Sequence, residues 1–257
     1  MVTGTGEIVP SNVRKSAITS QAIGVPELEA LMAAVPLGSD EAEYQKAVVE
    51  SNVLGLKTAT SREWRFQTLR RLYRLDTASI LFRALTDLWP GDPEAHPLLA
   101  CLCAMARDTV FRATADFIVA IGVGEEVART DFIEPIEKQY PGAYQESTIA
   151  TIAKKAYASW GQTGHLGNAE SGNRIRTRAV CKPENVAYAL MLGHLEGHRG
   201  EALFETGWTR VLDHPRSHLY DLAVAASQRG MLEFRNAGGV VEVGFRELLR
   251  PMEDQLL

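Results

Sequence analysis

The stretch that indicates the fold reads IATIAKKAYASWGQTGHL over residues 149–166 and continues as ESGNRIRTRA over residues 170–179. Its apolar side chains recur at the i, i+3, i+4, i+7 spacing of one buried helical face, which consists of Ile149, Ile152, Ala153, Ala156 and Trp160. Gly164-His165-Leu166 follows that face, and Glu170-Ser171-Gly172-Asn173 has the composition of a tight turn. The stretch therefore predicts a helix followed by a β-hairpin.

The same order recurs near the C-terminus. Leu219, Leu222, Ala223 and Ala226 form a second apolar face that runs into Gly230-Met231-Leu232. Gly238-Gly239 then predicts a hairpin turn, and the flanking strands alternate with Leu232, Phe234, Val241, Val243 and Phe245 inward. Helices followed by a short hairpin are typical of the winged helix, a scaffold that reads duplex DNA. We therefore expect two tandem winged-helix-like units, residues 123–182 and 183–257.

The remainder of the chain predicts a mainly α fold. Residues 12–122 are expected to form an all-helical N-terminal domain, preceded by a Gly/Thr-rich disordered lead at residues 1–11. The run from Leu98 to Met105 is apolar on almost every helical face and predicts a core helix. Further helices are expected over residues 26–35, 41–52, 110–121, 125–133, 135–140, 183–195, 201–212 and 217–229.

An alternating row of arginines makes the first unit the stronger candidate for binding nucleic acid. Alternate residues of a strand share a face, so Arg174, Arg176 and Arg178 are expected to form one cationic row. Lys154 and Lys155 lie off the apolar stripe of the preceding helix, and Lys182 closes the unit. Such a cluster suits DNA phosphates, because Lys and Arg displace condensed counterions. The alternative is a solvated edge strand that charge protects against aggregation.

A second group of cations crowds one N-terminal helix and consists of Arg62, Arg65, Arg70, Arg71 and Arg74. Arg70 and Arg74 share a helical face by their i, i+4 spacing. The favoured interpretation is that the arginines of this helix form ion pairs with acidic neighbours. The alternative is a secondary contact of Arg70 and Arg74 with the DNA backbone.

The second unit is expected to read DNA less well than the first. Between residues 184 and 230 the acidic side chains outnumber Arg199, Arg210, Arg216 and Arg229, and Asp221 lies on the helix that would enter the groove. A protein-docking role is at least as well supported there.

Composition excludes several classes of function. The formal net charge of −5 means that any nucleic-acid site is a local patch on an acidic body. The longest apolar run, Leu98 to Ala106, is too short for a membrane span, and the N-terminus lacks the features of a signal peptide. Three cysteines cannot form a paired disulfide framework, so we expect a cytoplasmic protein.

No motif predicts catalysis, a cofactor or a metal. His194 and His198 have the spacing of two zinc ligands, but the metalloprotease motif places its glutamate directly after the first histidine, whereas here it is Glu196. Gly197 and Gly200 also predict that the helix ends there. We therefore expect a structural role for the two histidines and no enzymatic activity.

Three segments resemble the BrxA-like family of bacteriophage-exclusion (BREX) defence proteins. They are Glu50-Ser51-Asn52-Val53-Leu54 leading to residues 70–76, Ser147-Thr148 through Gly164-His165-Leu166, and the stretch from Leu190 through Gly200, Leu203 and Trp208 to residues 230–234. The resemblance implies a small, mainly helical, non-enzymatic protein with helix-turn-helix elements that binds duplex DNA. It also implies partners encoded beside it, a DNA methyltransferase and ATPases. The chain departs from the family in its greater length, its N-terminal lead and its C-terminal hairpin.

These expectations combine into one hypothesis. The chain is expected to be a non-catalytic double-stranded DNA-binding component of a phage-defence system. The alternatives are a scaffold whose winged units bind protein partners, and a transcriptional regulator with a preferred DNA sequence.

Overall fold

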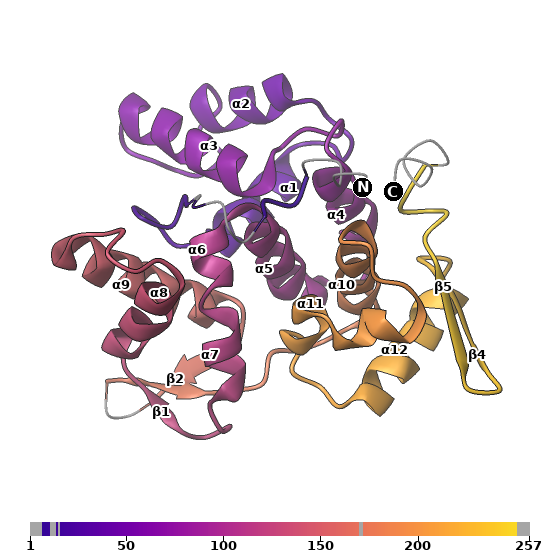
Figure 1. Cartoon of the computed structure of the whole chain (residues 1–257). Helices are drawn as coiled ribbons and strands as arrows, with labels where there is room; N and C mark the ends of the chain where they lie inside the picture. The colour runs from indigo at the N-terminus through magenta and orange to yellow at the C-terminus, as the bar shows by residue number, and fades with distance from the viewer. Residues whose placement is uncertain (1–6, 11–13, 15, 170–171, 251–257) are drawn as a thin grey trace.

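The computed structural model describes residues 7–10, 14, 16–169 and 172–250 (Figure 1). In the first half of the chain the helices are α1 (Val25–Ala34), α2 (Glu41–Val49), α3 (Ala59–Tyr73), α4 (Ile80–Leu88), α5 (His96–Arg107), α6 (Thr109–Arg112) and α7 (Ala115–Ala120). The second half contains α8 (Ile133–Gln139), α9 (Glu146–Gln162), α10 (Pro183–Leu195), α11 (Gly207–Arg210) and α12 (Arg216–Gln228). Three short 3-10 helices, η1 (Pro93–Ala95), η2 (Arg129–Phe132) and η3 (Gly200–Glu205), connect them. The prediction of a mainly α fold is confirmed.

Helices α5 and α10 pack against each other in the middle of the molecule (Figure 1). Every residue of α10 is buried, and so is α5 from Leu98 to Arg107. A helix that is apolar on nearly every face removes its side chains from water only when other elements surround it. The sequence-based prediction of a core helix over Leu98 to Met105 is therefore confirmed.

Within the described ranges, five short strands form two antiparallel sheets. In the first, β3 (Arg174–Arg176) lies between β1 (Glu126–Val127) and β2 (Leu166–Asn168), in the order β1-β3-β2. In the second, β4 (Glu233–Ala237) pairs with β5 (Val240–Gly244), and Gly238 and Gly239 turn the hairpin with φ of 59° and 81°. Positive φ at both central residues is what a two-residue turn of this kind requires, so glycine is favoured. Both predicted hairpins are confirmed, although residues 170–171 of the first turn lie outside the described residues.

Several predicted helices differ from the structure. The helix expected over residues 125–133 is wrong, since this segment contains β1 and η2 instead. β1 pairs with β3, whose residues lie almost 50 positions further along the chain, and such a distant partner leaves no local periodic signal. The expected helix over 110–121 is split into α6 and α7, and the one over 201–212 into η3 and α11.

The predicted disordered lead is wrong over residues 7–10. The Val9 amide donates to the carbonyl of Ala106 at 2.9 Å, and Arg107 Nη1 donates to the carbonyl of Glu7 at 2.6 Å. The Val9 side chain is buried, so this segment packs along the end of α5. Residues 1–6 and 11, the remainder of the predicted lead, lie outside the described residues.

One continuous cluster of buried apolar side chains extends from Ala17 to Leu249. It includes the contacts of α10 with α4 and α5, so the expected second unit packs directly on the N-terminal helices. The boundaries expected near residues 122 and 182 stay predictions. None of the helices in the described ranges combines the length and the apolarity that a membrane span requires.

Candidate nucleic-acid interface

Helix α9 presents one polar face to solvent. Its opposite face is buried as the sequence predicted, and Trp160 at its C-terminal end donates a hydrogen bond from Nε1 to Thr114 Oγ1 at 2.8 Å. The exposed face carries Ser147, Thr151 and Lys154, at the i, i+4, i+7 spacing of one helical side. Lys155 is half-buried beside them. The predicted position of both lysines off the apolar stripe is confirmed.

Arg174 on β3 lies across the C-terminal part of α9. Its Nη1 donates to the Tyr157 carbonyl at 2.9 Å, and its guanidinium carbon lies 4.9 Å from the centre of the Tyr157 ring. This arrangement depends on Gly161, where an added Cβ would overlap Arg174 Nη1. The aromatic ring and the carbonyl hold the guanidinium against the helix, on the side that Gly161 shares with Lys154 through their i, i+7 spacing. The sequence pattern had shown Arg174 only as a strand residue, not as one anchored to α9.

Arg176 is not part of an exposed cationic row, and this expectation is wrong. Its side chain is fully buried, and its Nη2 forms an ion pair with Asp213 Oδ2 at 2.8 Å. Its Nε donates to the Ile118 carbonyl at 2.7 Å, and Nη1 donates to the carbonyl of Thr177. Strand alternation places Arg174 and Arg176 on one side of β3, and Arg178 lies beyond the end of the strand. The segment between α11 and α12 covers Arg176. Arg176 therefore joins the first sheet to the second unit and is not accessible to a ligand.

Arg178 is the member of the row that remains half exposed. Its side chain is 51% exposed, and its Nε lies 3.6 Å from the same Asp213 Oδ2. Because Arg176 is closer to this carboxylate, the charge of Arg178 is only partly compensated. The three arginines thus lie in three environments: anchored on α9, buried, and half exposed.

The other predicted contacts lie in ion pairs or at a helix end. Lys182 Nζ lies 2.6 Å from Glu94 Oε2 and 2.9 Å from Asp92 Oδ2, and its hydrogen bonds to Glu94 and Asp92 raise its pKa to about 12. Arg70 Nε donates to Glu41 Oε2 at 2.9 Å, as the first interpretation of this helix expected. Arg74 is exposed and caps the C-terminus of α3 with a φ of 71°. Charge compensation weakens Lys182 and Arg70 as candidates for phosphate contacts.

His165 connects the first sheet to the second unit. It is fully buried, with Nδ1 2.7 Å from Thr163 Oγ1 and Nε2 2.9 Å from the Val211 carbonyl. Since a carbonyl only accepts, Nε2 carries the proton in this contact. Burial lowers the pKa of His165 to about 4, so the ring is neutral at neutral pH. It cannot touch phosphate, and its position after the helix end gave no signal of this tertiary role.

The His194/His198 pair does not form one helical face. Helix α10 ends at Leu195, and Gly197 has a φ of 95°. His194 is buried with its ring centre 5.0 Å from that of Phe245, whereas His198 is exposed. Across the ranges that the structure describes, no group of three or more His, Cys, Asp or Glu side chains could hold a metal ion.

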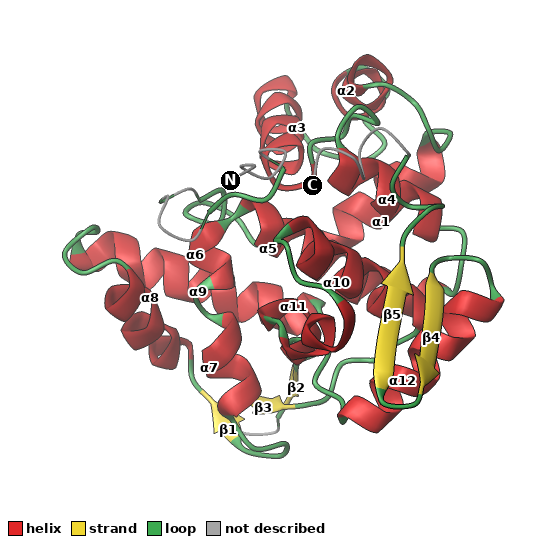
Figure 2. Cartoon of the chain, turned by 45° about the vertical axis from the view of Figure 1, so that its right-hand side comes forward, coloured by secondary structure: helices red, strands yellow, loops and turns green. Residues whose placement is uncertain are grey.

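Two acidic residues of the second unit lie on its first and last helices, in different environments. Glu184 is fully buried at the start of α10 and pairs with Arg229 at 3.1 Å, while Asp221 is exposed on α12. Hairpin β4–β5 lies against α12 on the outer side of the molecule, away from the first sheet (Figure 2). Val240 at its tip is 61% exposed, and Val224 on α12 is 44% exposed.

Comparison with solved structures shows a likeness in fold. The fold is similar to the crystal structure of an uncharacterized protein from Magnetospirillum magneticum, with a TM-score of 0.50 and 17% sequence identity. The alignment covers 77% of this chain and 97% of that one. No family model matches the chain, and no curated protein matches it. The likeness concerns the fold alone.

Proposed function

We propose that this chain is a non-catalytic protein that binds double-stranded DNA through α9 and the β2–β3 hairpin. The observation that carries the proposal is the position of Arg174, which Tyr157 holds against α9 over Gly161, on the helical side that also carries the exposed Lys154. Lys154, Lys155, Arg174 and Arg178 are the residues that we expect to contact phosphates. Arg176 is excluded because it is buried in an ion pair.

The order of elements around this surface supports a winged-helix interpretation. Helix α7, strand β1, helices α8 and α9, and hairpin β2–β3 follow one another, and the sheet order is β1-β3-β2. In such a unit the last helix enters the major groove and the hairpin lies along the backbone. Helix α9 has 17 residues and is about 25 Å long. Its exposed face carries small or flexible side chains, which allow a close approach to base edges.

The resemblance to BrxA-like proteins motivates a biological context. We infer that the DNA-binding surface serves a bacteriophage-exclusion defence system, acting beside a methyltransferase and ATPases. A cytoplasmic location follows from this inference.

The second unit favours a different partner. Exposed Val224 and Val240, together with acidic Asp221, suit a protein surface better than a phosphate-lined groove. Docking of another protein of the same system on α12 and hairpin β4–β5 is the second candidate function.

A gel-shift titration with duplex DNA at several salt concentrations tests the first proposal. Lys154→Ala, Lys155→Ala, Arg174→Ala and Arg178→Ala together should reduce the slope of log affinity against log salt by up to about 0.9 per contact. The matched control is Lys182→Ala, whose charge two carboxylates already compensate. Equal affinity and slope for the fourfold variant and the parent would refute the assignment of this surface.

A further inference from the structure

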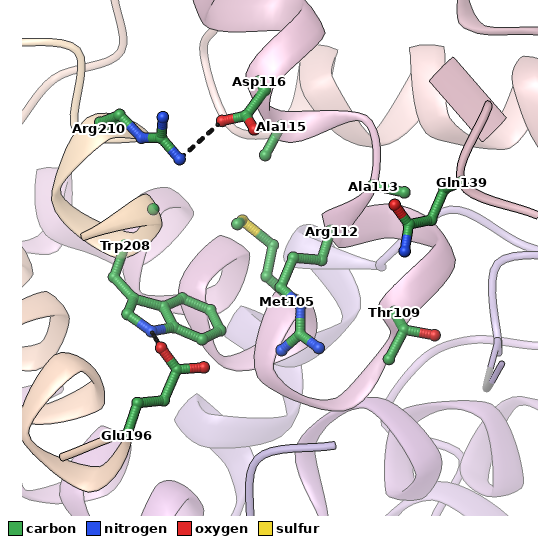
Figure 3. A pocket seen from close by; sticks show the side chains of 11 residues that line it. Met105, Thr109, Arg112, Ala113, Ala115, Asp116, Gln139, Glu196, Trp208 and Arg210 are labelled. Atoms are coloured by element: carbon green, nitrogen blue, oxygen red, sulfur yellow. Dashed lines mark hydrogen bonds and ion pairs between the residues drawn. The ribbon is translucent and has the colours of Figure 1, made fainter. Parts of the chain in front are cut away.

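A cleft of about 260 Å³ lies between α6, α7 and α11 (Figure 3). Its charged lining residues are Arg112, Asp116, Glu196 and Arg210, and Thr109, Gln139 and Trp208 add neutral polar groups. These residues belong to the N-terminal helices, to α8 of the first unit, and to the α10–α11 region of the second. The cleft is remote in sequence from the arginines of β3, and the proposed DNA surface does not use its residues.

Arg112, whose side chain is half-buried, brings a positive charge to this cleft. Its Nη2 donates to the Val9 carbonyl, and its guanidinium carbon lies 5.5 Å from the centre of the Trp208 ring. Its Nη1 is buried and has no hydrogen-bond partner among the described residues. An arginine stays protonated even where burial lowers its pKa, as it does here. A buried guanidinium donor without an acceptor is costly, so an acceptor placed in the cleft would be favourable.

Glu196 brings the opposite charge. Its Oε2 accepts a hydrogen bond from Trp208 Nε1 at 2.8 Å, and its carboxylate attracts the Arg112 guanidinium electrostatically. Figure 3 shows both charged groups beside the Trp208 ring, with no ion pair drawn between them. Glu196 is exposed, so its second carboxylate oxygen is accessible to a donor from a ligand.

The mouth of the cleft repeats this pairing of charges. Arg210 Nη2 lies 3.1 Å from Asp116 Oδ1, and both side chains are mostly exposed. The two arginines and two carboxylates around the cleft sum to zero formal charge. A dianion such as phosphate would be repelled by Asp116 and Glu196, whereas a ligand with one positive and one negative group matches the lining.

We propose that this cleft binds a small zwitterion of the α-amino-acid class. The ligand carboxylate accepts from Arg112 Nη1, and its ammonium group donates to Glu196. Met105, Ala113 and Ala115 supply the apolar part of the lining, which suits a short apolar side chain. The proposal goes beyond DNA binding and does not depend on it.

Isothermal titration calorimetry on the full chain tests the proposal without DNA. L-alanine, L-valine and L-methionine are titrated separately, each alongside its N-acetyl and its carboxamide derivative. We expect saturable binding of at least one free amino acid, and a loss of about tenfold or more in affinity when either charged group is blocked. Affinities weaker than about 10 mM for all three free amino acids would overturn the proposal.

Glu196→Gln is the decisive variant, because the amide oxygen can still accept from Trp208 Nε1 while the charge is lost. It should weaken binding of the free amino acid about tenfold or more and leave the N-acetyl derivative unaffected. Glu134→Gln, which removes an exposed carboxylate on α8 outside the cleft lining, is the matched control and should leave the affinity for the free amino acid unchanged. Ala113→Leu is a second test variant for the case that Glu196→Gln unfolds. It places a larger side chain in the cleft from a partly exposed position and should also weaken binding of the amino acid. Unchanged binding in both cleft variants, or tighter binding of inorganic phosphate than of any amino acid, would overturn the assignment.

Discussion

Replacing Arg176 by methionine is expected to destabilise the fold strongly and to leave the DNA-binding surface in place. Methionine keeps most of the aliphatic volume and removes the guanidinium. The variant loses the ion pair with Asp213 and the donors to the carbonyls of Ile118 and Thr177. Removing one partner of a buried ion pair costs about 3–5 kcal/mol. Asp213 keeps some solvent and the more distant Arg178, so we expect the lower end, about 3 kcal/mol.

Urea unfolding monitored by circular dichroism at neutral pH measures this change. For a chain of this length about 3 kcal/mol corresponds to a decrease of about 10 °C in Tm. Arg178→Met is the matched control, and because Arg178 is half exposed its loss should cost less than about 1 kcal/mol. Asp213→Asn removes the charge of the carboxylate without straining the backbone, because Asp213 has a φ of 57° and asparagine tolerates this region. Its effect on stability therefore reports the loss of the charge.

Two outcomes would refute the reasoning. The first is an Arg176→Met variant that unfolds within about 0.5 kcal/mol of the parent with an unchanged m-value. The second is a folded Arg176→Met variant that loses more DNA affinity than Arg174→Ala, because this would place Arg176 in the interface.

The remaining predictions concern three other positions. The folded-state pKa of His165, about 4, lies below its unfolded value of about 6.5, so between these values only the unfolded chain binds the proton. The free energy of unfolding should therefore fall by about 3 kcal/mol from pH 7 to pH 4. Urea unfolding at several pH values between 7 and 4 measures this decrease. If a His165→Gln variant loses the same free energy of unfolding over this range, the effect belongs to another group. Gly161→Ala should displace Arg174 and reduce the affinity for DNA as much as Arg174→Ala does. It should not lower the stability of the fold, since alanine favours a helix. A Gly161→Ala variant with the affinity of the parent in a gel shift would contradict this prediction. Lys182→Ala should change the free energy of unfolding little in urea, because solvent reaches both of its ion pairs and screens them. A large loss of stability would show a structural role.

Local patterns predicted many of the regular elements well. Helix α10 spans the 183–195 range that Pro183 and the apolar run indicated, and α12 lies within one residue of its expected ends. The Gly238-Gly239 turn and the buried Leu232 and Phe245 follow from the period-2 alternation around it. These features succeed because helix periodicity, strand alternation and turn chemistry act over a few neighbouring residues.

The candidate site was predicted only in part. Lys154 and Lys155 were found from the helical period, since residues off an apolar stripe face solvent. The anchoring of Arg174 on Tyr157, the role of Gly161 and the whole cleft around Arg112 were missed. Each of these depends on segments that are distant in sequence, and no local pattern reports such contacts.

The sequence by itself determined that Arg174 and Arg176 share one side of a strand, because side chains alternate along an extended backbone. Arg178, the third arginine of the expected row, lies beyond the end of β3. Only the tertiary structure decided what covers that side. The segment after α11 brings Asp213 over the middle of the row, so Arg176 becomes a buried ion pair while Arg174 turns onto α9 and Arg178 stays half exposed. Alternation specifies direction relative to a strand, whereas burial depends on which distant segment packs there, and that choice is made by the folded chain as a whole.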